Sequence, residues 1–475
     1  MDSAAESPRT TTFGAAWSLW ALLLGVGLLM LGNGLQGSLL GVRASSEGFG
    51  NTVTGIVMSA YFGGFLLGST LTPHKLRDVG HIRVFAALAS ITSVAILVHV
   101  MYVDPWVWGA MRFVTGFAYA GLYVVSESWL NGYASNRLRG RLLGFYMVIS
   151  YLGQGGGQLL LNLADPGGVL LFLLVSILVS LALVPILLSY TPQPDTSQPE
   201  SMSLIRLCRL SPLGTIGCLL SGISTGVILG MGAVFATNSG MTVNQVATFM
   251  GAFILGGALL QWPIGKLSDK SDRQWVIVAV AAIAMLLALF GLGHADWSPM
   301  ALTLLAILLG GTTLTLYSLF LACANDFLTP HQIVTASSSL VLALGIGAIL
   351  GPASAGLLMD WLGPNGFMWD LALIHGAIVV FGLFCIQRYP SDASEEHGHY
   401  VAASPGTATL GAAWTEEAAG EAIQLELHWM RSKTTLEIPG SVMQEALPRC
   451  SDRASCLTSP TAISAAYFAF STARQ

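Results

Sequence analysis

The stretch RFVTGFAYAGLYVVSESWLN, Arg112 to Asn131, is long and apolar enough to form a helix that crosses a membrane. It nevertheless carries an arginine near one end and a glutamate near the other. At 100° per residue, Arg112, Tyr119, Tyr123 and Glu127 all lie on one side of that helix, and the other side is apolar. The two charges stand about 22 Å apart at a rise of about 1.5 Å per residue, so they cannot pair with each other.

Ionisable residues inside membrane helices usually face a bundle interior or a wet cavity and mark a pathway. We therefore predict that Arg112 and Glu127 serve a transport path. A carboxyl group with little water around it is easier to protonate, which suits Glu127 as a carrier of a coupling proton. The alternative is that Arg112 extends to the outer membrane boundary and Glu127 pairs with loop arginines at the inner boundary.

The composition of the whole chain agrees with a membrane protein. Hydrophobic residues make up 53% and charged residues 9% of the 475 residues, whereas a soluble domain has about 25% charged residues. Twelve apolar runs recur along the chain, at about 16–40, 50–72, 83–103, 106–131, 140–162, 168–190, 213–238, 246–265, 275–294, 299–323, 333–357 and 367–387. Only helices can span lipid with runs of this kind. The sequence thus predicts an all-α integral membrane protein with two sets of six transmembrane helices.

The expected organisation has four parts. The first six helices occupy residues 1–190 and the second six residues 213–390, with a cytoplasmic linker at 191–212 between them. MSLIRLCRL within this linker suits a short amphipathic helix on the membrane surface. Residues 391–475 are acidic and lack periodicity, so we expect a disordered cytoplasmic tail.

The loop charges predict the orientation of the chain. With both termini in the cytoplasm, Arg43 is the basic residue of the outer loops. The inner loops then hold Lys75, Arg77, Arg83, Arg137, Arg139, Arg141, Arg206, Arg209, Lys266, Lys270 and Arg273. This asymmetry is typical of cytoplasmic loops. We expect a multi-pass protein of a bacterial inner membrane.

Polar side chains also recur within other predicted spans. The candidates for a substrate cavity are Asn33, Gln36, Tyr61, Tyr119, Tyr123, Gln154 and Gln158. The alternative for any of them is a hydrogen bond between packed helices, worth about 0.6 kcal/mol.

Known catalytic patterns do not support an enzyme. The Gly265-Lys266 pair resembles a phosphate-binding loop, but that pattern needs a glycine where Leu260 stands. HExxH and paired-cysteine motifs are missing from the sequence. We expect no cofactor and no metal, and the net charge of −5 gives no reason to expect nucleic acid as a partner.

Several segments resemble the major facilitator superfamily over residues 12–390. GKLSDKSDR is similar to its loop signature GxLaDrxGrk, and Arg112, Gly116 and Gly121 loosely resemble its fourth-helix motif. RFVTGFAYAGLYVVSESWLN, RLRGRLLGFYMV, QWPIGKLSDK and ILGPASAGLLM resemble the bacterial YcaD-type branch. The first-half loop departs from the signature, because Arg77 stands where the motif has aspartate.

The resemblance implies two six-helix bundles around a central cavity that work by alternating access. We therefore expect a monomeric secondary transporter that moves a small solute through the bilayer, coupled to protons. Its cytoplasmic gate would comprise Asp269 and Arg273 on one side and Arg137 and Arg141 on the other. The alternative is a transporter-like membrane receptor that signals without transport.

Overall fold

The computed structural model describes residues 20–133, 136–188, 202–328 and 330–388, without the side chains of 131–141, 143, 294–296, 299, 330, 331 and 334. The predicted tail at 391–475 and the first half of the predicted linker, 191–201, lie outside this part. The described residues are almost entirely helical and contain no strand, and all of them belong to one compact unit. The all-α prediction is confirmed.

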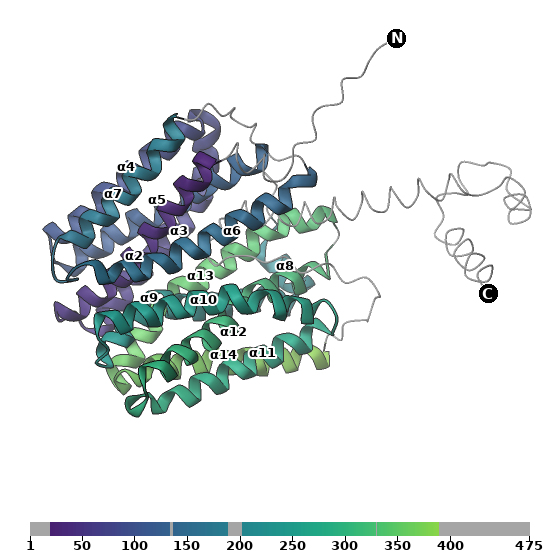
Figure 1. Ribbon diagram of the computed structural model, residues 1–475. Helices are drawn as coiled ribbons and strands as arrows, with labels where there is room; N and C mark the ends of the chain where they lie inside the picture. The colour runs from purple at the N-terminus through teal and green to yellow at the C-terminus, as the bar shows by residue number, and fades with distance from the viewer. Residues whose placement is uncertain (1–19, 134–135, 189–201, 329, 389–475) are drawn as a thin grey trace, which may run out of the picture. The chain divides into compact units, whose positions relative to one another are not determined.

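Six long helices form the first bundle, drawn purple to blue in Figure 1. They are α2 (Trp20–Ser46), α3 (Asn51–Val79), α4 (His81–Met101), α5 (Pro105–Tyr133), α6 (Asn136–Leu159) and α7 (Leu170–Leu188). A single 3₁₀ turn, Leu160–Leu163, follows α6. Within this bundle α3 packs on α5, α2 on α6 and α4 on α7.

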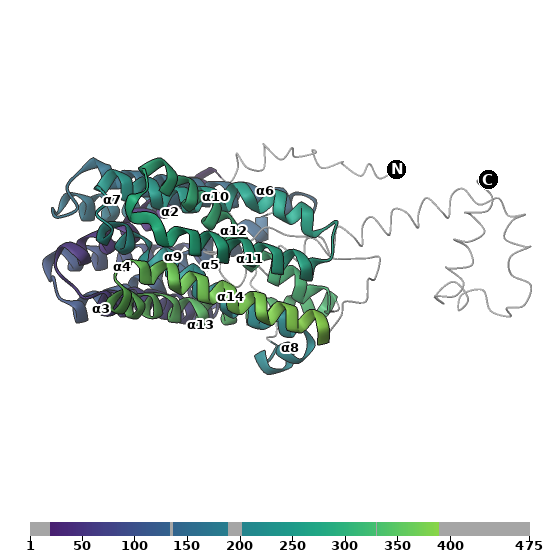
Figure 2. The same ribbon diagram turned by 90° about the horizontal axis from the view of Figure 1, so that it is seen from below.

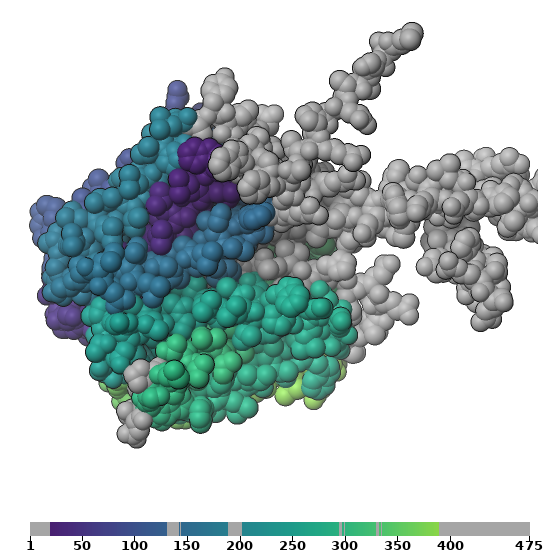
Figure 3. Space-filling model, in the orientation of Figure 1, coloured from purple at the N-terminus to yellow at the C-terminus, as the bar shows by residue number. Residues whose placement is uncertain are grey.

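Six further long helices form the second bundle, drawn teal to light green in Figures 1 and 3. They are α9 (Pro212–Asn238), α10 (Val243–Ser268), α11 (Arg273–Phe290), α12 (Pro299–Asn325), α13 (Pro330–Leu362) and α14 (Asn365–Arg388), with a 3₁₀ segment Gly291–Asp296 before α12. Here α10 packs on α12, α9 on α13 and α11 on α14. The pairing of second with fourth, first with fifth and third with sixth helix therefore repeats in both halves, as pseudo-symmetry predicts.

Local sequence signals set several helix starts. Thr242 and Gln245 form a capping box before α10, with hydrogen bonds of 2.8 and 3.4 Å between the backbone of each and the side chain of the other. Ser298 caps α12 and Asp272 caps α11. The helix predicted in MSLIRLCRL is present as α8 (Leu204–Leu210), which is labelled in Figure 2. Leu207 of this helix is buried.

Ten of the described helices are long and apolar enough to cross a membrane. The helices α5 and α6 are outside that set. α5 ends at Tyr133, and α6 begins with the arginine-rich residues 136–141. We call the end that carries the α2–α3, α9–α10 and α13–α14 connections the outer end, after the predicted orientation. The opposite end, where α14 finishes, is the inner end.

Three helix pairs make most of the contacts between the two bundles. They are α3 with α13, α6 with α10 and α2 with α9. Glycines make the first pair close, because a Cβ atom added to Gly55 would overlap the carbonyl oxygen of Pro352, and one added to Gly356 would overlap that of Asn51. Backbones therefore touch across the bundles near the outer end.

Candidate functional site

A cavity of about 80 Å³ lies at the centre, between the two bundles. Its first-bundle lining comes from α2, α3, α5 and α6, and its second-bundle lining from α9 and α10. The lining residues are Met30, Asn33, Gly34, Gly37, Ser38, Tyr61, Phe62, Phe65, Arg112, Tyr123, Gln154, Gln158, Leu229 and Met250. Six of the predicted site residues thus meet here: Asn33, Tyr61, Arg112, Tyr123, Gln154 and Gln158.

A larger hollow of about 550 Å³ lies at the outer end of α10 and α12. Its described lining belongs to the second bundle alone and holds no charged side chain. The central cavity is the better candidate, because it touches both bundles and carries the buried charge of Arg112.

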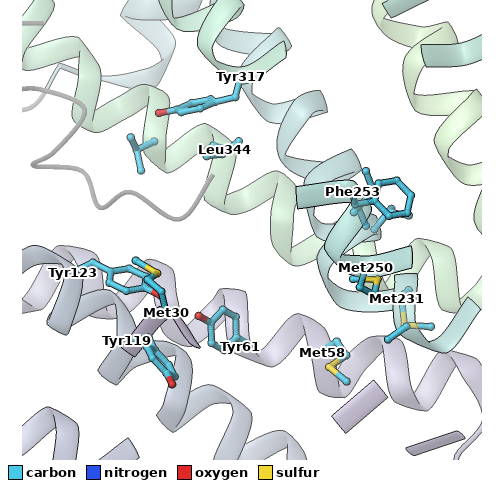
Figure 4. Close-up of a cluster of buried hydrophobic side chains, with 14 of the residues drawn as sticks. Met30, Met58, Tyr61, Tyr119, Tyr123, Met231, Met250, Phe253, Tyr317 and Leu344 are labelled. Atoms are coloured by element: carbon cyan, nitrogen blue, oxygen red, sulfur yellow. The ribbon is translucent and has the colours of Figure 1, made fainter. Parts of the chain in front are cut away.

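One hydrogen-bonded chain crosses three helices of the cavity wall. The Tyr61 hydroxyl donates to Asn33 Oδ1 at 3.2 Å, and Asn33 Nδ2 donates to the Tyr123 hydroxyl at 2.9 Å. The guanidinium carbon of Arg112 lies 4.3 Å from the centre of the Tyr61 ring, within the range of a cation–π interaction. Figure 4 shows Tyr61 and Tyr123 on the first-bundle side and Met250 on the opposite side.

Arg112 is buried, with 4% of its surface exposed. Its Nε finds no hydrogen-bond partner among the described residues. The salt bridges in the described part of the chain join Arg43 to Glu47 and Arg273 to two aspartates, and Arg112 takes part in none of them. Arg112 is thus a buried cation beside a cavity, and no anionic side chain among the described residues pairs with it.

The two glutamines of α6 have different surroundings. Gln158 accepts a hydrogen bond from the Ser38 hydroxyl and donates to the carbonyl oxygens of Gly34, at 3.0 Å, and Gln154, at 3.4 Å. Its amide therefore holds α6 to α2, which is the packing role that the alternative interpretation gave to such residues. Gln154 lines the cavity one helical turn earlier, and no side-chain hydrogen bond holds it to the described residues.

Two predicted cavity residues lie elsewhere. Gln36 is fully buried inside the first bundle, and neither its amide nitrogen nor its oxygen has a partner among the described residues. It stands one turn after Gly32, whose neighbours are Val179 and Tyr119, so this side of α2 faces α5 and α7. Tyr119 is also behind the cavity wall, with its ring centre 6.0 Å from that of Tyr123.

Glu127 is separated from the cavity lining as well. Its side chain is fully buried toward the inner end of the first bundle, and the Tyr146 hydroxyl of α6 donates to its Oε1 at 3.0 Å. Arg112 and Glu127 share α5 but face different surroundings, because Arg112 borders the space between the bundles and Glu127 contacts α6.

The predicted inner gate is described only on its second-bundle side. Arg273 Nη2 lies 3.4 Å from Asp269 Oδ1, and its Nη1 lies 2.6 Å from Asp326 Oδ1. Arg273 therefore ties α10, α11 and α12 together at the inner end. The side chains of Arg137 and Arg141 lie outside the described residues. Sequence reasoning missed Asp326, although it directly follows the last residue of an apolar helix.

A second site that sequence reasoning missed lies at the outer end. Asp360 of α13 accepts four hydrogen bonds from the start of α3. They come from the backbone and side chain of Asn51, at 3.2 and 3.0 Å, and of Thr52, at 3.0 and 2.6 Å. Asn238 of α9 donates to Asn51 Oδ1 at 2.7 Å. A carboxylate of one bundle therefore caps a helix of the other.

The sequence profile described as Major Facilitator Superfamily matches residues 22–340 and 214–416, in two overlapping segments. The chain belongs to this superfamily. Relatives named "Uncharacterized MFS-type transporter YcaD" from Escherichia coli strains are 29–30% identical over 346 residues, which are 72% of this chain and 89% of theirs. The resemblance to the YcaD-type branch is confirmed, and the superfamily member described here is a multi-pass membrane protein with bacterial relatives.

Solved structures support the same fold. The crystal structure of nucleoside transporter NupG aligns with a TM-score of 0.64 over 79% of this chain and 99% of NupG, at 14% identity. A bacterial homologue of the human lysosomal transporter Spinster, in an inward-facing and occupied conformation, aligns with a TM-score of 0.60 over 86% of this chain and 97% of that one, at 16% identity. At 14–16% identity, the two alignments show a shared fold and nothing further.

Proposed function

We propose that this superfamily member moves a small solute across the cytoplasmic membrane of a bacterium by alternating access, coupled to protons. The central cavity carries the proposal, because residues of both bundles line it at the boundary where the bundles separate. Asn33, Tyr61, Arg112, Tyr123 and Gln154 are the proposed substrate contacts. Gln158 is part of the cavity wall, where it holds α6 to α2. Tyr119 and Gln36 lie behind the wall.

The outer contacts suggest which state of the cycle is present. The Asp360 hydrogen bonds and the close glycine contacts join α3 and α13 at the outer end. We assign this arrangement to a state closed toward the outside. In the opposite state these contacts separate, and the inner loops that hold Asp269 and the arginines of α6 come together.

Glu127 is the proposed proton carrier. It is the carboxyl group of α5, and it is buried within the first bundle, where the Tyr146 hydroxyl donates to its Oε1 at 3.0 Å. Glu127 would take up a proton from one side of the membrane and release it to the other. Both steps would be linked to the contact between α5 and α6.

The test of the proposed function is transport in vesicles that contain the purified chain. Uptake of solutes from a metabolite library is measured with and without an imposed pH gradient. Accumulation that needs the gradient supports a proton-coupled transporter. Saturable binding without movement of any bound solute would contradict the proposal and favour the receptor alternative.

Opening of the outer contact is the first prediction. Asp360→Asn keeps the size of the side chain but removes the charge at the start of α3, an interaction worth about 0.3–1 kcal/mol. We expect the ratio of outward-open to outward-closed molecules to rise about two- to fivefold. A cysteine placed at Met250 in the cavity reports this ratio through labelling by an impermeant reagent from each side of the membrane.

Asp104→Asn is the matched control for this experiment. Asp104 accepts hydrogen bonds from Trp106 and Val107 at 2.9 and 3.1 Å, so it caps α5 within its own bundle at the outer end. The Asp104→Asn substitution should leave the ratio of labelling from the two sides unchanged. Equal effects of the two substitutions would show that Asp360 does not act as a contact between bundles.

The inner gate gives a prediction of opposite sign. Asp269→Asn removes a carboxylate proposed to pair with Arg141 of α6 when the inner side closes. We expect labelling of the Met250 cysteine to rise from the inside and fall from the outside, by about two- to fivefold. Arg141→Ala should do the same, and the double substitution should add little.

Asp272→Asn serves as the control, since Asp272 has the same charge in the same loop and caps α11 by accepting a 2.9 Å hydrogen bond from the Gln274 backbone nitrogen. Unchanged access in a well-expressed Asp269→Asn protein would remove Asp269 from the gate.

A further inference from the structure

We infer that the central cavity binds a small organic anion with one carboxylate, held by Arg112, and with an apolar or aromatic body. This inference rests on the proposed function, because it names the class of substrate for the same cavity. The observation behind it is a buried cation that lines the cavity and has no anionic side chain beside it among the described residues.

Among the described residues, no acidic side chain pairs with the charge of Arg112. Arginine stays charged in proteins, and a buried charge without a counter-charge is costly. Glu127 is fifteen residues away on the same helix, about 22 Å along its axis, and contacts Tyr146 instead. A bound anion supplies the missing counter-charge, so the free energy of burying Arg112 favours anionic over neutral or cationic ligands.

The geometry leaves the guanidinium able to bind such a group. Its guanidinium carbon lies 4.3 Å from the centre of the Tyr61 ring. The N–H donors of a guanidinium lie in one plane, and they match the two oxygens of a carboxylate. The ring of Tyr61 is itself held by its hydrogen bond to Asn33.

The number of charges limits the anion. Arg112 is the single charged residue in the cavity lining that the structure describes. A phosphate group carries nearly two negative charges at neutral pH and is usually bound by more than one cation or by several backbone donors. One arginine therefore favours a monocarboxylate.

The rest of the lining suits an apolar body. Phe62, Phe65 and Met30 line the first-bundle side, and Leu229 and Met250 are the contribution of the second bundle. A ligand whose carboxylate meets Arg112 would thus place its opposite end against apolar side chains.

The test measures binding by the purified full chain, apart from transport, so that a failed inference differs from a failed transporter. Benzoate, benzamide and benzylamine carry the same ring with a negative, a neutral and a positive group. Hexanoate replaces the ring by an alkyl chain. Inorganic phosphate tests whether an anion without an apolar body binds. We expect benzoate or hexanoate to bind at least tenfold more tightly than benzamide, benzylamine or phosphate.

The arginine variants connect this preference to Arg112. Arg112→Gln should weaken carboxylate binding at least tenfold and remove the preference for benzoate over benzamide. The affinity of Arg112→Lys for carboxylates should lie between those of Arg112→Gln and the original protein. Arg43→Gln, which removes a cation at the outer end, should change binding by less than twofold. If Arg112→Gln does not fold, the Lys variant and the comparison of acid, amide and amine remain decisive.

Tighter binding of benzylamine or benzamide than of either carboxylate would overturn the inference, as would a preference for phosphate or failure of the whole series to bind. Proton-driven uptake of neutral or cationic solutes with no carboxylate binding would also overturn it, and would leave the proposed transporter function intact.

Discussion

Glu127→Gln is expected to abolish accumulation of substrate against its gradient while exchange of substrate across the membrane continues. Glutamine keeps the shape of the side chain and can accept the hydrogen bond from Tyr146, but it cannot take up or release a proton. The pH gradient then has no group through which to act on the cycle. Accumulation should fall at least tenfold, to the level of the equilibrium distribution.

The measurement is uptake and counterflow of one substrate in vesicles with an imposed pH gradient. Glu47→Gln is the matched control, because Glu47 is a carboxylate at the outer end that pairs with Arg43 at 2.6 Å. It should keep wild-type accumulation. Accumulation by Glu127→Gln at the original level would assign the coupling proton to another group, and loss of exchange would show that Glu127 has a structural role.

Gly116→Ala is expected to have the largest effect on folding. An added Cβ at Gly116 would overlap the Tyr61 carbonyl oxygen of α3, and the reciprocal position Gly64 meets the Phe113 carbonyl oxygen of α5. Backbone atoms cannot rotate away as a side chain can, so the two helices must separate. Overpacking costs about 1–3 kcal/mol where side chains adjust, and we expect about 3 kcal/mol or more here.

The thermal unfolding midpoint of the purified protein and its yield in the membrane measure this effect. Gly109→Ala is the control on the same helix, since a Cβ at Gly109 has no heavy atom within 4 Å. It should leave the unfolding midpoint unchanged or raise it slightly. A stable Gly116→Ala protein would mean that α3 and α5 tolerate a wider separation, and the position of Tyr61 in the cavity wall should then change.

These two predictions concern different properties of α5. Gly116 brings α5 against α3, where Arg112 and Tyr61 meet at the cavity. Glu127 lies further along the helix, beside α6. The polar side of α5 thus supplies the cavity and the proposed proton site at two depths of the same bundle.

The helices themselves were predictable from the sequence because hydropathy is a local property. A span needs about 20 apolar residues, so each of the twelve long helices left a separate run in the chain. The expected bounds differ from the observed ones by several residues, as with an expected end at residue 40 for the first helix, against Ser46 for α2. Helices extend into the membrane boundary, where polar residues continue the backbone hydrogen bonding after the apolar run has ended.

The polar stripe of α5 was predictable for the same reason, since helical periodicity places Arg112 and Tyr123 on one side. The sequence determined the number of long helices, their two sets of six and the helices that carry polar groups.

The tertiary structure alone decided the partners of those groups. It separated Gln36 from Asn33, although they are three residues apart, because the packing of α7 and α5 against α2 covers one and the gap between bundles exposes the other. It also brought Asp360 to Asn51, which is 309 residues away in the chain. Such contacts depend on the distances and angles between packed helices, and those are sums over many residues that no local pattern contains.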